Sequence, residues 1–457
     1  MVLTAFAAAS PSVAQDVSRI VPPSGVIGVQ DAMLTPDYWI ARTASPNTLL
    51  MTPGEIGARN RRSFASDPNL VDLARIGPTI SRERVLEWIK SIASPLTTPP
   101  VDAKGKPISR DALNDAVANE DIDSIPANQA ARYGMAVRRA QLRIYPTELH
   151  AFASIDALDF ESFQAGILFP GDAVIVLHRS RDRRWLLVQS WQGPAWVRDE
   201  DIATGAAAEV LGYRGAGPFR VVTGSKVRTV FTPEAPAVSE LQLDMGANVP
   251  LAQVPANQPV NGEGPSQSWP INLPTRAEDG TLRFVPALLP KSEATAPAYL
   301  PLTRANIIRQ AFRFLGERYG WGHMYNARDC SGFTSDVYRS MGVVLPPNSG
   351  AQGSSPAIRH QLFTAADSKA ARLKAVMAAD VGDLLVVPGH VMMFLGKIGG
   401  QPYMIQDVPY AIFRDKAGQL HKTKLNQVSV TPLLPLLYDD NRTYVDAMTS
   451  LVHVTAQ

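Results

Sequence analysis

The chain has 457 residues, a length that predicts about three domains at roughly 150 residues each. Its 44 Lys and Arg residues nearly balance its 42 Asp and Glu residues, which excludes the broad basic field that draws proteins to nucleic acid. The single cysteine, Cys330, excludes an internal disulfide framework and any metal site built on several cysteines. The seven histidines lack paired ligand spacing, so neither a metal nor another cofactor is expected. No segment offers the ~18 consecutive apolar residues of a membrane-spanning helix, so no integral membrane segment is expected.

The first residues, MVLTAFAAASPSVAQD, are apolar and rich in alanine. Small residues at Ser12 and Ala14 fit cleavage by signal peptidase after Ala14, although no Lys or Arg precedes the short apolar run. We interpret residues 1–15 as a truncated signal segment, which predicts a mature chain in the periplasm or cell envelope. The alternative is a frayed, alanine-rich terminus.

Residues 16–140 are predicted to form a helical N-terminal domain. Thr52-Pro53-Gly54-Glu55 is a capping box with proline at the first helical position. Ser81 is placed to cap a second helix with an apolar stripe over residues 85–92, and residues 111–141 again show a helical pattern. These segments carry no chemical motif, so we expect a packing or shielding role.

Short runs rich in Val, Leu and Trp begin near Tyr145, namely AVIVLHRS, RWLLVQSW and AWVRDEDIA. They predict the strands of a first small β-barrel over residues 141–210. The runs FRVVTGSKVRTVF and TLRFVPALL predict a second barrel over residues 211–295. Residues 248–274, rich in Pro, Asn, Gln and Gly, are expected to be a long surface loop.

Residues 296–457 change pattern again. Thr303 is expected to cap a helix that ends by Gly316, and the loop YGWGHMYN leads to a second helix that starts near Cys330. The runs DLLVV, HVMMFLG and PYMIQDV read as strands, with KIGGQ as the turn between the last two. Helices followed by an antiparallel sheet predict an α+β domain.

Cys330 is the candidate nucleophile. A helix N-terminus stabilises a thiolate and lowers the pKa of the thiol, although a free cysteine is also often just a small buried apolar residue. Among the histidines, His390 begins a strand directly after a Pro-Gly turn, which would fix its direction. If KIGGQ is a hairpin turn, Gln406 on the next strand can orient the imidazole. His323 is the competing base, but a flexible, glycine-rich loop would aim it poorly.

These residues, in this order, resemble the NlpC-type cysteine peptidases of bacterial cell walls. The resemblance runs through RYGWGHMYNARDCSGFTSDVYRSMGVVLPPNSGAQ, DVGDLLVVPGHVMMFLG and YMIQDV. It implies a papain-like α+β catalytic domain with Cys330 as nucleophile, His390 as base and Gln406 as the third residue. The family often has histidine at this third position, and glutamine can orient the ring but adds no negative charge.

The resemblance extends upstream, to a branch of the family with a helical N-terminal domain and two bacterial SH3-like domains. TPDYWIARTASPNTLLMTPGEIGARN is similar to the helical domain, and residues 143–203 are similar to the first SH3-like domain. Members of this branch are γ-D-glutamyl-L-diamino acid endopeptidases, and several prefer fragments with a free N-terminal L-Ala. The implied partners are peptidoglycan stem peptides or muropeptide fragments, and a monomer is the default expectation.

The resemblance also implies roles around the bond that is cut. The Cys330 thiolate would attack the carbonyl, with its own backbone N–H and the Tyr319 hydroxyl as oxyanion donors. The residues implied for the L-Ala/D-Glu subsite, with Trp321 as an apolar wall, are Asp329, Ser331, Trp321 and Ser349. From approximate position alone, we expect Glu161 and Trp191 of the first barrel to extend this subsite.

Two other functions fit the same sequence. One is a peptidoglycan-binding scaffold whose catalytic domain has decayed, although the presence together of Cys330, His390 and Gln406 argues against decay. The other is an amidase or acyltransferase that uses the same dyad on another acyl group.

Overall fold

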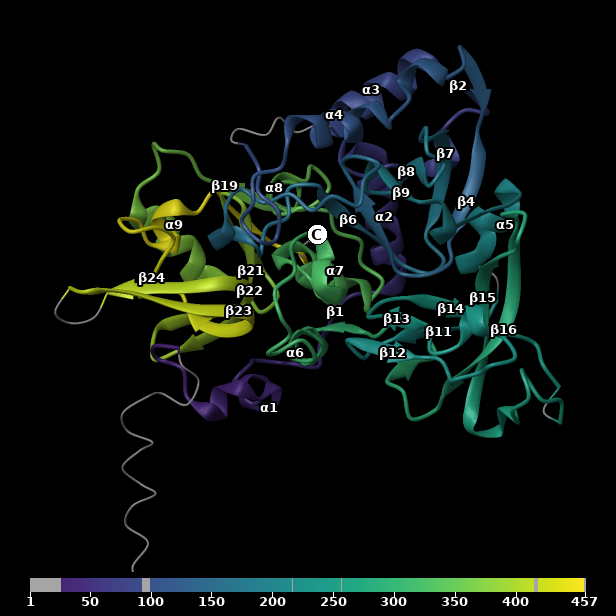
Figure 1. Cartoon of the computed structure of the whole chain (residues 1–457). Coiled ribbons are helices and arrows are strands. Elements are labelled where there is room, and N and C mark those ends of the chain that lie inside the picture. Colours follow the sequence, from purple (N-terminus) through teal and green to yellow (C-terminus); the bar gives the residue numbers. More distant parts are fainter. Residues whose placement is uncertain (1–25, 93–98, 216, 256, 415–417, 456–457) are drawn as a thin grey trace, which may run out of the picture.

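A computed structural model describes residues 26–92, 99–215, 217–255, 257–414 and 418–455, and Figure 1 shows their arrangement. The predicted signal segment, residues 1–15, lies outside the described residues. In Figure 1 the green and yellow C-terminal part lies on one side, and the blue and teal β-rich parts lie on the other. No helix within the described ranges is long and apolar enough to cross a membrane.

The N-terminal part is only partly helical. The predicted capping box is present, because the Thr52 hydroxyl accepts a hydrogen bond from the Glu55 N–H at 3.3 Å and the Glu55 carboxylate accepts one from the Thr52 N–H at 2.6 Å. The helices and short strands of this part are α1 Pro36–Ile40, β1 Leu49–Met51, α2 Pro53–Ser66, β2 Thr79–Ser81, α3 Arg82–Ile92, α4 Arg110–Ala118 and β3 Asn128–Ala130. Strand β1 pairs with β18 (Leu302–Thr303), so this part is joined to the C-terminal domain by a sheet.

The prediction of helix over residues 111–141 was wrong beyond Ala118. The chain instead forms β3, β4 (Arg132–Ala136) and β5 (Ala140–Arg143). Strand β4 pairs with two strands that lie far along the chain, β7 (Ala173–Arg179) and β10 (Ile202–Thr204). These non-local hydrogen bonds override the local helical pattern.

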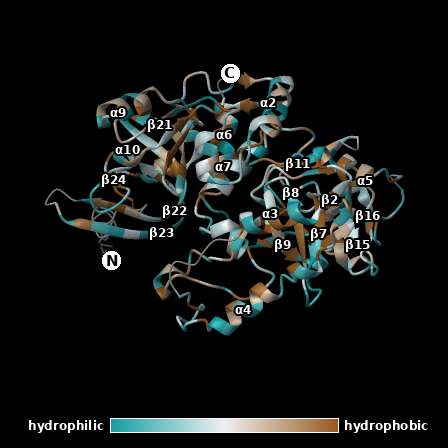
Figure 2. Ribbon diagram, turned by 90° about the horizontal axis from the view of Figure 1, so that it is seen from above, coloured by the Kyte–Doolittle hydropathy of each residue, from teal (hydrophilic) through white to brown (hydrophobic). Residues whose placement is uncertain are grey.

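The first β-rich domain is a seven-stranded antiparallel sheet with the order β10-β4-β7-β8-β9-β5-β6. Its remaining strands are β6 Gln164–Leu168, β8 Trp185–Ser190 and β9 Gly193–Arg198, and helix α5 Ala207–Gly212 follows β10. Figure 2 shows β7 and β9 coloured largely as hydrophobic. Buried side chains of β7, β8 and β9, among them Val174, Val188 and Val197, form one core.

The second β-rich domain has three small sheets around one core. Its strands are β11 Phe219–Val222, β12 Lys226–Arg228, β13 Gln242–Asp244, β14 Asn248–Pro250, β15 Ser268–Arg276, β16 Leu282–Pro290 and β17 Thr295–Ala296. The predicted surface loop over 248–274 was wrong at both ends, where β14 and β15 form. Ile271 and Leu273 of β15 are fully buried in this core, so burial decides the strand despite the neighbouring prolines.

The C-terminal domain confirms the predicted α+β class. Its main sheet has the order β19-β25-β20-β21-β22-β23, with β24 paired to β22. Its helices are α6 Arg304–Phe312, α7 Cys330–Arg339, α8 Ser349–Ser354, α9 Lys369–Ala378 and α10 Tyr444–Ala447; its strands are β19 His360–Leu362, β20 Leu384–Val387, β21 His390–Ile398, β22 Gln401–Arg414, β23 Leu420–Pro432, β24 Leu436–Leu437 and β25 Ser450–Val452. One face of the sheet buries α6 and α7, and the other buries residues of α9 and α10.

Two local predictions in this domain are confirmed. The Thr303 hydroxyl caps α6 by accepting the Asn306 N–H at 3.1 Å. The KIGGQ segment is a two-residue hairpin turn between β21 and β22, in which Gly399 and Gly400 have φ of +56° and +80°. Positive φ at both turn residues matches the right-handed twist of the strands and requires glycine-like residues.

Candidate active site

Cys330 is the first residue of α7, as predicted, but its thiol is not activated in the predicted way. It is only 4% exposed and packs in the core beside Phe333. Burial, and after it the negative charge of Asp329, raises the pKa of the Cys330 thiol well above its ordinary value, against the lowering effect of a hydrogen bond from the Val391 backbone. The expectation of a depressed pKa was wrong, because burial outweighs the field of the helix N-terminus.

His390 is held by the residue that was predicted to orient it. Its Nε2 lies 2.6 Å from the Oε1 of Gln406, and the Gln406 amide nitrogen donates to the Thr431 hydroxyl at 2.7 Å. Because the Gln406 oxygen that faces the ring can only accept, His390 Nε2 carries the proton and Nδ1 is left as the basic atom. Burial lowers the pKa of His390 to about 4, so the ring is neutral near pH 7.

The neighbour of His390 in β21 links it to the nucleophile, since the backbone of Val391 hydrogen-bonds the Cys330 sulfur. The competing base, His323, packs edge-on to Phe169 with ring centroids 6.0 Å apart, and burial lowers its pKa to about 3. His323 Nδ1 has no hydrogen-bond partner among the described residues, so nothing orients this ring as Gln406 orients His390.

Two tyrosines flank the candidate dyad. Tyr319 is 3% exposed, and burial together with the nearby Cys330 and Asp329 raises the pKa of its phenol, which therefore stays a hydrogen-bond donor. Tyr444, on α10, has its ring centroid 6.3 Å from that of His390, and its pKa is raised first by burial and then by Cys330. Sequence reasoning missed Tyr444, because it lies far beyond the motifs and no local pattern marks it.

Asp329 is the N-cap of α7. Its Oδ1 accepts hydrogen bonds from the Gly332 N–H at 2.8 Å and the Ser331 hydroxyl at 2.9 Å, and its Oδ2 accepts one from the Gly322 N–H at 3.0 Å. The structure therefore brings Asp329 and Ser331 together beside Cys330. Ser349 begins α8 and is 9% exposed. The substrate-binding roles of these residues stay predictions.

The first β-rich domain contributes an aromatic residue to this region. Phe160 lies with its ring centroid 5.5 Å from Trp321 and 5.7 Å from Tyr319. Phe160 and Trp321 are each 37% exposed, so together they offer an accessible apolar wall beside the tyrosine. Sequence reasoning did not find Phe160, although it chose the adjacent residue.

The expectation for Glu161 was wrong. This side chain is 0% exposed, pairs with Arg143 at 2.8 Å and accepts hydrogen bonds from the N–H groups of Ala151 and Phe163. Its negative charge is therefore paired with Arg143 inside the first β-rich domain and does not face a substrate. Trp191 lines a different cavity, with Phe169 and the outer side of α7, and Cys330 and His390 are not among the residues of its wall.

The loop Trp321–Asn326, here called the aromatic loop, was expected to be flexible, but hydrogen bonds to other parts of the chain hold it in place. His323, Tyr325 and Asn326 have φ of +65°, +57° and +54°, a left-handed conformation that costs non-glycine residues free energy. Both β-rich domains hold it. Gln164 donates to the Gly322 carbonyl, and the side-chain amides of Gln242 and Asn326 exchange two hydrogen bonds, all three at 2.8 Å.

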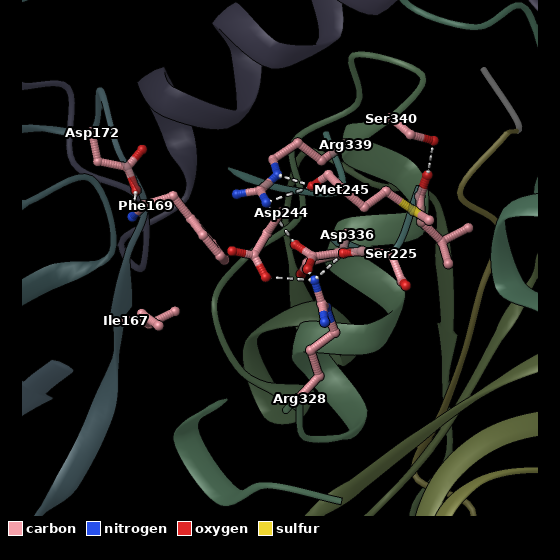
Figure 3. A network of polar contacts seen from close by, with 12 residues as sticks. Ile167, Phe169, Asp172, Ser225, Asp244, Met245, Arg328, Asp336, Arg339 and Ser340 are labelled. Carbon is pink, nitrogen blue, oxygen red and sulfur yellow. Dashed lines mark hydrogen bonds and ion pairs between the residues drawn. The ribbon is translucent and has the colours of Figure 1, made fainter. Parts of the chain in front are cut away.

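The residue that precedes Asp329 anchors this corner of the molecule. Arg328 is 1% exposed and binds Asp336 at 2.5 Å, Glu317 at 2.7 Å and Asp244 at 3.0 Å. Figure 3 shows Arg328 pointing toward Asp336 and Asp244. Since Asp244 belongs to β13 and Asp336 to α7, the network fixes the second β-rich domain against the helix that carries Cys330.

Asp407 follows Gln406 on β22 and was not noticed from the sequence. It is 0% exposed, and neither carboxyl oxygen has a partner within the described part of the chain. Burial, reinforced by Asp329 and Glu317, raises the pKa of Asp407 well above its ordinary value. No group of three or more His, Cys, Asp or Glu residues that could hold a metal ion occurs in the described ranges.

A buried cysteine at a helix start, with an oriented histidine on the adjoining sheet, defines an α+β hydrolase site of the cysteine-peptidase class. Residues 316–434 match the NlpC/P60 family, and residues 151–198 match the SH3 domain of SH3b1 type. Residues 316–434 of the C-terminal part thus match an NlpC/P60 domain, as the motifs there indicated. Family and site together support a cell-wall cysteine peptidase.

One solved structure has the same fold as this chain. An NlpC/P60 endopeptidase from Photobacterium damselae subsp. piscicida is 15% identical, with a TM-score of 0.74 over 92% of this chain and 97% of that chain. The fold is thus shared over nearly the whole length. An NlpC/P60 family protein from Bacillus cereus ATCC 10987 is 17% identical, with a TM-score of 0.43 over 64% of this chain and 83% of that chain. No curated protein matches the chain.

Proposed function

We propose that this protein cleaves the bond between γ-D-glutamate and the diamino acid in peptidoglycan stem peptides, and that it favours fragments with a free N-terminal L-Ala. The observation that carries the proposal is the hydrogen bond between His390 Nε2 and Gln406 Oε1, which leaves Nδ1 as the basic atom of a histidine whose neighbour in β21, Val391, hydrogen-bonds the Cys330 sulfur. The periplasm or cell envelope is the compartment that this substrate implies, and the active form is a monomer.

The chemistry is acyl transfer through a thioester. Because the thiol and the imidazole are both uncharged in the free site, the Cys330 proton moves to His390 Nδ1 as sulfur attacks the carbonyl carbon. The Cys330 backbone N–H and the Tyr319 hydroxyl stabilise the oxyanion. The imidazolium then protonates the leaving amine, and His390 removes a proton from the water that hydrolyses the thioester.

Asp329 and Phe160 are the residues that we expect to set substrate preference. Asp329 is half-buried, and its carboxylate faces the start of α7, where it can pair with the α-amine of L-Ala. The rings of Phe160 and Trp321 form an apolar wall at this end of the site. A longer, acylated N-terminus would have to displace this wall.

The direct test is incubation with L-Ala-γ-D-Glu-diaminopimelate beside the same peptide acetylated at its amine. Release of diaminopimelate by the wild type but not by Cys330→Ala supports the proposal. Cleavage at another bond, or transfer to an added amine, would favour an amidase or acyltransferase, and binding to wall fragments without cleavage would favour a scaffold.

The apolar wall has its own matched test. Phe160→Ala should raise KM for the free-amine peptide by about 2- to 10-fold, the value of one aromatic pair. Phe231→Ala is the control, because Phe231 is a 62% exposed aromatic residue of the second β-rich domain. Equal effects of the two substitutions would remove Phe160 from the substrate site.

A further inference from the structure

A second cavity, of about 330 Å³, lies between helix α2 and the segment that follows α8. Three arginines line it, Arg59 and Arg62 from α2 and Arg359 from the C-terminal domain, and Glu55 is the acidic residue of its wall. None of the residues of this wall belongs to the candidate active site.

Among the residues of this wall, Arg59 has buried hydrogen-bond donors without a partner in the described part of the chain. It is only 2% exposed, and its Nη1 donates to the Val454 carbonyl, but its Nε and Nη2 have no partner among the described residues. These two nitrogens form one edge of the guanidinium. Arg304 and Arg442 use the same edge in this chain to bind Asp380 and Asp439, respectively. That edge is the fork with which arginine binds carboxylates and phosphates.

A buried guanidinium with two unsatisfied donors is costly and calls for a counter-ion or ordered water. Burial lowers the pKa of Arg59 to about 10, so it remains charged at neutral pH. Arg62 and Arg359 are exposed, and no carboxylate of the described residues forms an ion pair with either. Glu55 already accepts hydrogen bonds from Thr52. Three guanidiniums and one carboxylate give the wall a surplus of two positive charges.

We propose that this cavity, the arginine cavity, is a binding site for a phosphate group, either free phosphate or a phosphomonoester. Phosphate at neutral pH carries about 1.5–2 negative charges and several acceptor oxygens, which match the surplus positive charge of the wall. A bound phosphate would connect α2 to the C-terminal domain, because Arg62 and Arg359 come from these two parts. It would therefore stabilise the folded chain in proportion to its occupancy.

The experiment is calorimetric titration and thermal unfolding of the full chain with inorganic phosphate, at an ionic strength held constant with sodium chloride. Glycerol 1-phosphate forms the phosphomonoester arm, and acetate forms the carboxylate arm. We expect saturable binding of phosphate, a Tm that rises with its concentration, and weaker binding of acetate. No saturable phosphate binding, or acetate bound as tightly as phosphate, would overturn the assignment.

Matched variants locate the site. Arg62→Gln and Arg359→Gln should each weaken phosphate binding about tenfold or more, the loss typical of one charge-assisted contact. Arg61→Gln is the control, because Arg61 is an exposed residue of the same helix and is not part of the cavity wall. Both cavity variants should retain peptidase activity. Equal weakening by Arg61→Gln would show that the net charge of the surface, not the cavity, attracts the ion.

Discussion

Gln406 offers the sharpest test of the candidate active site. Gln406→Glu would replace the neutral amide oxygen 2.6 Å from His390 Nε2 with a carboxylate of the same length. The carboxylate would stabilise the imidazolium, whereas the wild-type amide can only orient the ring. The substitution therefore separates charge from geometry at one position.

The size of the effect follows from the contact distance. An opposite charge within hydrogen-bond reach raises the pKa of a histidine by roughly 1–3 units, which is about 1.4–4 kcal/mol in favour of the charged form. His390 starts from a pKa of about 4. Because the base must be neutral to accept the thiol proton, activity is lost as pH falls through this pKa. The acidic limb of kcat/KM should thus lie near pH 4 in the wild type and move upward in Gln406→Glu.

The assay is the pH profile of kcat/KM on the free-amine peptide for wild type, Gln406→Glu and Gln406→Ala. Gln406→Ala removes the orienting group without adding charge, so its rate should fall, by no more than the ~10²–10⁴-fold that a general base contributes. An acidic limb that stays in place in Gln406→Glu would refute His390 as the base, or would refute the assignment of Nε2 to Gln406.

Three further predictions concern the framework of the site. Gln242→Ala should raise KM in steady-state kinetics, because the amide pair that holds Asn326 is lost. The double variant Gln242→Ala/Asn326→Gly should raise KM little further, because both substitutions remove the same pair. Arg328→Met should lower the free energy of unfolding by about 3–5 kcal/mol in urea titrations, because it leaves buried carboxylates without a partner. Adding Asp244→Asn should restore part of this free energy, because it removes one of the unpaired buried charges. The folded-state pKa of His323, about 3, lies below its unfolded value of about 6.5. The unfolded chain therefore binds more protons between these values, so stability should fall as pH drops from 6.5 to 3, and His323→Gln should flatten this slope in urea unfolding.

Much of the candidate site was predictable because its signals are local. Thr303, Thr52 and the two glycines of the KIGGQ turn act on the backbone within a few residues, so their caps and turn formed as expected. The pairing of His390 with Gln406 followed from that turn, because a hairpin places residues of adjacent strands side by side. The helix predicted over residues 111–141 was wrong for the opposite reason, since pairing with strands far along the chain decided the structure of this segment.

The sequence by itself supplied the candidate catalytic residues, the α+β class of the C-terminal domain and the order of the β-rich segments, because residue type, capping and strand periodicity are local properties. Only the tertiary structure decided how these residues behave. Burial, which depends on the whole chain, raises the pKa of Cys330 where its helix position predicted the reverse. Folding also pairs Glu161 with Arg143 inside its own domain and leaves Phe160 partly exposed against Trp321. It also leaves an unpaired edge on Arg59.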